Sequence, residues 1–168
     1  CWSLVETKFV YILTEHDLAI VEEEVAQALS KYGDTLTHGR NHEQNIRIGC
    51  MCEITVAKFL QVPFVPEYEG RTADMRDVCG YEVKGTDYFN GGMNTRDDMP
   101  TGIYIGAYVT WPNKVTLQGW STSRMMRREM YWDATRPKPC YYLPPDQMWH
   151  ESTLPATKQL IEQRKQIA

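Results

Sequence analysis

The sequence lacks any apolar run long enough for a membrane-spanning helix, and no segment has the pattern of a signal peptide. It also lacks internal repeats and low-complexity tracts, and its ordinary composition gives no indication of a disordered, collagen-like or coiled-coil protein. We therefore expect a cytoplasmic protein (in the host cytoplasm if it is viral) with no membrane partner. The chain has 168 residues, of which 42% are hydrophobic and 24% charged, and this predicts one domain over residues 1–168.

Cysteines in zinc-binding spacing are absent as well. Five cysteines occur, and Cys50 and Cys52 form the one close pair. Residues two apart on a helix point to different faces, so this pair is poorly placed to share a metal ion. Reduced thiols in a cytosol-like compartment are therefore expected.

An excess of positive charge is missing too, since the net charge is −4 at pH 7. This excludes a protein that holds nucleic acid by bulk electrostatic attraction. The charge is uneven, however: residues 1–70 carry 5 basic and 11 acidic side chains, and residues 71–168 carry 13 and 11. A local basic face on the C-terminal half is compatible with these counts.

Two carboxylates and an ammonium group occur within the eight residues from Asp77 to Lys84. In a strand, Glu82 and Lys84 point to one face and Val83 to the other, and Gly80 lets the chain bend between Asp77 and the strand. Adjacent carboxylates repel each other unless a cation lies between them, and Mg²⁺ (or Mn²⁺) suits such oxygen ligands. The main-chain carbonyl of Val83 is a further candidate ligand, and Lys84 would orient or help to deprotonate an attacking water. The pattern predicts metal-assisted phosphodiester hydrolysis. The alternative is a charged strand preceded by an aspartate in a turn, because a D-x4-E-x-K string also arises by chance.

At these residues the chain resembles the PD-(D/E)xK nuclease superfamily, whose core motif is D-xn-(D/E)-x-K. Arg76 stands where the family name has proline. The resemblance implies an α/β, restriction-endonuclease-like fold, in which helices flank a mixed central sheet. Some branches carry an acidic residue on the first core helix in a Gly-x3-Glu setting, and Gly49 to Glu53 has that form. The resemblance therefore implies that Glu53 reaches the metal site, and that Gly49 lets its helix approach the sheet.

Apolar periodicity and breaker residues predict the elements around this motif. We expect strands over 8–13, 103–109 and 115–120, helices over 14–33, 44–60, 121–131 and 156–168, and an extended segment over 135–145. Glu22, Glu23 and Glu24 are expected on a solvated helix face. The resemblance extends over about 45–155, because Gly119-Trp120 and Tyr142-Leu143-Pro144 match the C-terminal part of small phage-type members. The strand and helix over 8–33 precede this core.

Arginines are the candidates for nucleic-acid contact. Arg124 and Arg128 are four residues apart and would share a face of the predicted helix, with Arg127 and Arg47 as further candidates. A solvated basic face is an equally good interpretation. Trp111, Trp120, Trp132 and Trp149 are candidates for base stacking, although packing is the more ordinary role of tryptophan.

The functional hypothesis is a Mg²⁺-dependent nuclease acting on nucleic acid, with DNA favoured. In it Asp77 and Glu82 bind the metal, Glu53 supports it, and Lys84 positions the water. The partner is DNA, and a homodimer or a place in a larger assembly is compatible with the motif. One alternative is a catalytically inactive nuclease-fold protein that serves as a nucleic-acid-binding or structural subunit, for instance of a virus. A second alternative is an unrelated small α+β binding protein.

Overall fold

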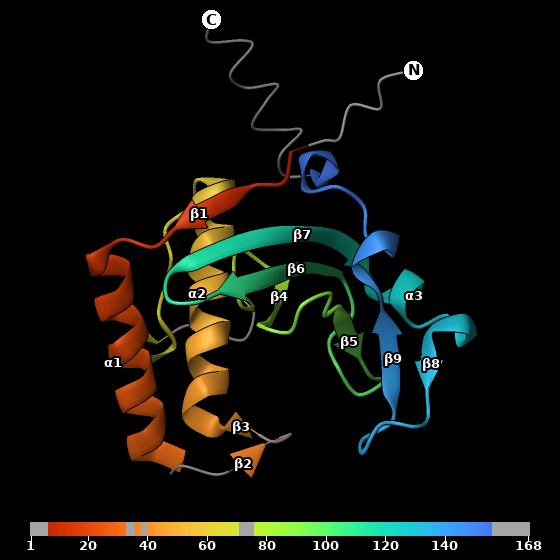
Figure 1. Ribbon diagram of the computed structural model, residues 1–168, viewed down its shortest axis with the longest axis horizontal. Coiled ribbons are helices and arrows are strands. Elements are labelled where there is room, and N and C mark those ends of the chain that lie inside the picture. The colour runs from red at the N-terminus through yellow and green to blue at the C-terminus, as the bar shows by residue number, and fades with distance from the viewer. Residues whose placement is uncertain (1–6, 33–35, 38–39, 71–75, 156–168) are drawn as a thin grey trace, which may run out of the picture.

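A mixed four-stranded sheet forms the centre of the computed structural model, which describes residues 7–32, 36–37, 40–70 and 76–155 (Figure 1). Its strands lie in the order β1-β7-β6-β4, with β4 parallel to β6 and the other neighbours antiparallel. Their bounds are β1 Val10–Ile12, β4 Glu82–Thr86, β6 Ile103–Thr110 and β7 Lys114–Thr122. The prediction of an α/β fold with a mixed central sheet is confirmed. The helix predicted over 156–168 and the helix end at Gly33 lie outside the described residues.

Two long helices, α1 (Glu15–Tyr32) and α2 (His42–Leu60), pack against each other on one side of this sheet (Figure 1). The short antiparallel pair β2 (Leu36–Thr37) and β3 (Arg40–Asn41) precedes α2 in the chain. The larger apolar core lies between α2 and the sheet, and includes Val83, Ile105 and Leu117. None of the helices in the described part of the chain has the length and apolarity needed to cross a membrane.

A second, three-stranded sheet packs on the other face, in the order β5-β9-β8. Its strands are β5 Met93–Thr95, β8 Trp132–Asp133 and β9 Cys140–Leu143. With the short helix α3 (Ser123–Met126) it encloses a smaller core of Met93, Tyr104, Met126 and Leu143. Single 3-10 turns cover Glu67–Glu69, Glu129–Tyr131, Pro145–Gln147 and Glu151–Thr153. Since neighbouring residues of β6 point to opposite faces, Tyr104 belongs to one core and Ile105 to the other.

The helix predicted over 121–131 is wrong. Strand β7 continues to Thr122, whose side chain then caps α3 by accepting a hydrogen bond from the N–H of Met125 (3.3 Å). The helix ends at Met126, and Arg128 is extended, with ψ of 145°, before the turn Glu129–Tyr131 begins. Arg124 and Arg128 therefore do not share a helix face.

The buried carboxylates of Glu24 and Asp17 join segments that the sequence pattern does not connect. The prediction of a solvated glutamate run is wrong for Glu24, which is buried and accepts a hydrogen bond from the N–H of Glu67. In the first turn of α1, Asp17 is 3% exposed. Burial raises the pKa of Asp17, but hydrogen bonds from Thr14 and Tyr11 and the charge of Lys58 outweigh this, so the pKa is lowered. One carboxylate thus joins β1, α1 and α2.

Replacing Asp17 with asparagine tests this buried charge. Because the folded-state pKa lies below the unfolded value of about 3.9, the carboxylate stabilises the fold above that pH, and its contribution is lost as the pH falls through the lowered pKa. We expect Asp17→Asn to cost about 2 kcal/mol at pH 7, the scale of hydrogen bonds to a charged group. Urea unfolding between pH 7 and pH 3 should show this difference shrinking; a difference independent of pH would contradict the assignment.

The prediction that the helix approaches the sheet closely at Gly49 is wrong, because the close approach occurs at Gly85. A Cβ at Gly85 would lie 2.7 Å from Cys52 Sγ and 2.9 Å from Ile48 Cγ2, whereas one at Gly49 would meet nothing within 4 Å. We expect Gly85→Ala to destabilise the fold by about 1–3 kcal/mol through overpacking. Gly49→Ala is the matched control and should stabilise it by about 0.5–1 kcal/mol through helix propensity. Equal effects in urea unfolding would contradict this packing.

Candidate functional site

Strand β4 lies at one end of the central sheet and presents two chemically different faces. The side chain of Val83 packs into the core beneath α2, so Glu82 and Lys84 point to the opposite face. Glu82 is 9% exposed and lies opposite Tyr104 in the register with β6, while Lys84 is half-buried. A carboxylate and an ammonium thus share one face of an edge strand.

Asp77 is brought to this strand by a tight turn. Val78 and Tyr81 pair across the turn, and Cys79 and Gly80 between them have φ of 49° and 83°. The turn returns the chain so that Asp77 Oδ2 accepts a hydrogen bond from the N–H of Val83, at 2.7 Å. The N–H and C=O of one strand residue point the same way in the sheet plane, so the Val83 carbonyl also faces the edge that carries Asp77.

An aromatic ring supports Lys84. Its Nζ lies 5.7 Å from the ring centre of Tyr104, which is completely buried. The Tyr104 hydroxyl donates a hydrogen bond to the carbonyl of Pro100 at 2.6 Å, which fixes the ring in its place. The ring face attracts a cation, so the ammonium is held on the face that Glu82 shares.

Glu53 is half-buried on α2, the helix that covers the other face of the sheet. Burial raises the pKa of the neighbouring Cys52 thiol, and the charge of Glu53 raises it further. Over the described residues, no three histidine, cysteine, aspartate or glutamate side chains are grouped as metal ligands. The structure therefore does not gather Glu53 with Asp77 and Glu82 into one ligand group.

The candidate metal ligands on β4 and its preceding turn are oxygens: the carboxylates of Asp77 and Glu82 and the carbonyl of Val83. This donor chemistry fits Mg²⁺ or Mn²⁺, which are commonly held by one or two carboxylates, with waters and substrate phosphate completing the shell. A structural zinc site calls for four cysteine or histidine ligands, and the turn before β4 supplies a single cysteine, Cys79.

The four candidate arginines have different environments. The guanidinium of Arg47 binds Glu22 (2.9 Å) and Glu43 (2.7 Å), and the hydrogen bond with Glu22 is the main cause of its raised pKa. Arg127 donates to the carbonyls of Met99 (2.7 Å) and Pro100 (3.1 Å) and so fixes the segment that positions Tyr104. These two guanidinium groups serve intramolecular contacts.

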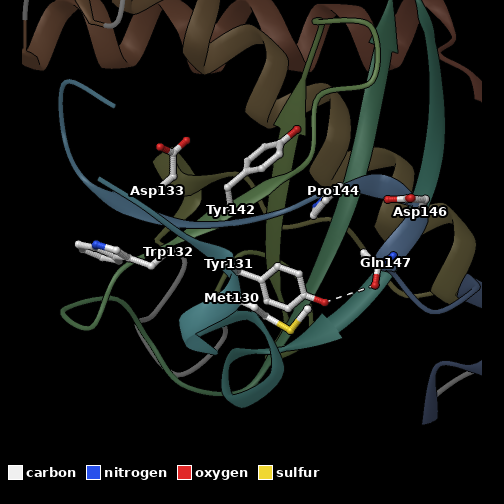
Figure 2. Close-up of a pocket in the computed structure, with 8 residues that line it drawn as sticks. All are labelled: Met130, Tyr131, Trp132, Asp133, Tyr142, Pro144, Asp146 and Gln147. Carbon is white, nitrogen blue, oxygen red and sulfur yellow. Dashed lines mark hydrogen bonds between the residues drawn. The ribbon is translucent and has the colours of Figure 1, made fainter. Parts of the chain in front are cut away.

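Arg124 and Arg128 are exposed, and they remain the better candidates for phosphate contact. Both lie close in sequence to a cavity of about 460 Å³ on the second sheet (Figure 2). Eight residues line it: Met130, Tyr131, Trp132, Asp133, Tyr142, Pro144, Asp146 and Gln147. None of these is among the predicted catalytic or metal-binding residues. In the sequence this cavity is marked by the aromatic pair Tyr131-Trp132, which follows Arg127 and Arg128 after two residues.

Comparisons with protein-family models, curated protein sequences and solved structures find no match to this chain. The functional interpretation therefore depends on the chain's own residues and their arrangement.

Substitution of Asp77 separates its structural role from metal binding. In Asp77→Asn the amide oxygen can still accept from the Val83 N–H, whereas Asp77→Ala leaves that N–H without its partner and should cost about 1–3 kcal/mol. We expect both variants, and Glu82→Gln, to weaken Mn²⁺ binding in calorimetry by about tenfold or more. A loss of this size already results when residues that only contact the metal ligands are replaced. Asp98→Asn, at an exposed aspartate, is the control. Wild-type Mn²⁺ affinity in Asp77→Asn would exclude a metal site at this edge.

Proposed function

We propose that the protein is a metal-dependent nuclease of the PD-(D/E)xK type that hydrolyses phosphodiester bonds in nucleic acid, with DNA as the favoured substrate. The observation that carries the proposal is the arrangement on β4. Glu82 and Lys84 share one face of the strand, and the carboxylate of Asp77 accepts a hydrogen bond from the N–H of Val83, the residue between them. Chance recurrence of the D-x4-E-x-K string does not require the hydrogen bond that holds Asp77 at the edge of β4.

The order of elements gives further support. Helix α2 is followed by the turn at Asp77, then by β4 and by the antiparallel pair β6 and β7, with β4 parallel to β6. This is the order of the restriction-endonuclease-like core that the sequence resembles. We propose that the fold belongs to this class, with the second small sheet as an addition to the core.

Each residue has a distinct role in the proposed reaction. Asp77, Glu82 and the Val83 carbonyl would hold the divalent cation, which supplies Lewis-acid polarisation of a phosphoryl oxygen. The ammonium of Lys84, held against Tyr104, orients the attacking water and stabilises the negative charge that grows on the phosphate. Its contribution is greatest in the transition state and therefore raises the rate more than the affinity.

A second candidate function is that of a non-catalytic nuclease-fold protein that binds nucleic acid. The observation that favours it is the position of Glu53, which the described structure does not group with the other two carboxylates. A two-carboxylate site can still hold Mg²⁺, so the catalytic proposal takes precedence.

Cleavage assays distinguish these two functions. Linear duplex, circular duplex, single-stranded DNA and RNA are incubated with Mg²⁺, Mn²⁺ or EDTA. We expect cleavage that requires the metal, and a rate about a hundredfold or more lower in Lys84→Ala, as when other electrostatic groups are removed. Folding and nucleic-acid affinity should stay near wild type in Lys84→Ala. Lys114→Ala, at an exposed lysine on β7, is the control. Absence of cleavage by the wild type on all four substrates would favour the non-catalytic function.

A further inference from the structure

Arg76 stands immediately before Asp77, at the position where the PD-(D/E)xK family name has proline. Its φ is 48°, in the left-handed region that residues other than glycine seldom adopt. Backbone outliers of this kind persist only where the surrounding structure maintains them, and they are frequent at functional sites. The fold thus holds Arg76 in a backbone conformation that its own side chain does not favour.

The guanidinium of Arg76 lies against Gly102, the residue before β6. A Cβ at Gly102 would be 2.7 Å from Nη1 of Arg76 and 3.5 Å from Cζ, so a side chain there would have to displace the guanidinium. Gly102 is itself fixed by Ser123: its N–H donates to Ser123 Oγ at 3.0 Å, and its carbonyl accepts from the Ser123 N–H at 2.8 Å. The guanidinium therefore has a defined position at the start of β6.

In the described part of the chain, no carboxylate or carbonyl is bonded to this guanidinium. Four other half-buried arginines each bond an acceptor within the protein at 3.0 Å or less: Arg47, Arg96, Arg127 and Arg136. Arg76 is half-buried as well. A guanidinium carries five N–H donors, and those of Arg76 remain for water or for an acceptor from another molecule.

This position lies near the end of β4 that carries the candidate metal ligands. The register with β6 sets Glu82 opposite Tyr104, and Gly102 precedes Tyr104 by two residues, about 7 Å of extended chain. Asp77 directly follows Arg76 in the chain. A guanidinium without a protein acceptor is thus placed beside the strand end where the two carboxylates would hold a divalent cation.

A second guanidinium adjoins the same place. Ser123, which is bonded twice to Gly102, is the first residue of α3, and Arg124 follows it with an exposed side chain. The planar fork of a guanidinium matches two oxygens of a phosphate group, and arginine is therefore well suited to bind the backbone of a nucleic acid. The start of β6 and the start of α3 together provide two such groups.

We propose that Arg76 binds a backbone phosphate of the nucleic acid adjacent to the scissile phosphate, and that Arg124 contributes to this contact from α3. The inference rests on the proposed function and adds to it a residue that positions the substrate. A phosphate that does not react is held equally well in the ground state and in the transition state. Arg76 should therefore lower KM and leave kcat nearly unchanged, whereas Lys84 acts on the reacting phosphate.

Kinetics and binding of Arg76→Gln test this contact. A short duplex DNA and the corresponding single strand are cleaved in Mg²⁺, and their binding is followed by fluorescence anisotropy in Ca²⁺ at several salt concentrations. We expect KM to rise about tenfold, the scale of a hydrogen bond to a charged group, with kcat within about twofold of wild type. The slope of log K against log salt should shrink by about 0.9 for the duplex, or about 0.7 for the single strand, which is the value for one phosphate.

Two further variants serve as controls. Arg47→Gln removes the same charge from a half-buried arginine that is already bonded to Glu22 and Glu43, and it should keep the wild-type KM and salt slope. Arg76→Lys keeps the charge and should keep the salt slope while losing part of the affinity, because an ammonium lacks the planar fork. Urea unfolding of Arg76→Gln should match wild type, since no described residue bonds the guanidinium.

The outcomes separate this inference from the nuclease proposal. A smaller salt slope in Arg76→Gln, in a protein that shows no cleavage, supports the phosphate contact and removes the catalytic function. Mg²⁺-dependent cleavage, together with Arg76→Gln that behaves like Arg47→Gln, does the reverse. The inference is also overturned if Arg76→Gln lowers kcat at unchanged KM, which would place Arg76 at the reacting group. Marked loss of stability in urea would show a structural role, and it too is overturned if wild type binds neither DNA.

Discussion

The parallel pairing of β4 with β6 is the constraint on which the rest of the candidate site depends. It sets Glu82 opposite Tyr104 and Val83 opposite Ile105, so each strand contributes one side chain to each face. A shift by one residue would place the carboxylate and the ammonium beneath α2 and expose Val83. Burial of Val83 and Ile105 in the larger core therefore fixes the positions of Glu82 and Lys84 as well.

The outer edge of β4 illustrates how one hydrogen bond can serve both stability and function. An edge strand leaves backbone donors that can pair with another chain. Asp77 accepts the hydrogen bond of the Val83 N–H, so this donor is not available to pair with another chain. The same contact keeps a carboxylate beside the strand, where a divalent cation would need it. Alanine at this position would remove both the acceptor at the edge and a ligand of the proposed metal site, whereas asparagine would keep an acceptor for the Val83 N–H and lose only the charge.

The basic side chains around the two cores differ in their environments. In the α2 half, the guanidinium of Arg47 is neutralised by Glu22 and Glu43, and Lys58 pairs with Asp17. In the half that contains the second sheet, Arg124 and Arg128 are exposed. A chain with a net charge of −4 would therefore attract a phosphate backbone only locally.

Features that depend only on local geometry could be predicted from the sequence. Alternation along a strand requires Glu82 and Lys84 to share a face, and helical periodicity predicted α2 to within two residues of its observed start at His42. The pairing of Thr14 with Asp17 at the start of α1 is also a short-range pattern, since the Asp17 N–H donates to Thr14 Oγ1 at 3.1 Å. Such contacts depend only on residues a few positions apart.

Features that depend on residues distant in the sequence are set only in the folded structure. Strand β7 continues through Thr122 because β6 pairs with it to that point, with Ile103 opposite Thr122, and this shortens the helix predicted there. Gly85, and not Gly49, is the close contact because Cys52 and Ile48 lie over it. The cavity on the second sheet requires β9 to pair with β8, because its lining includes residues 142 and 144 as well as residues 130–133. Sequence periodicity reports which face of an element is apolar, but not which element covers it, and that is settled only when the strands pair.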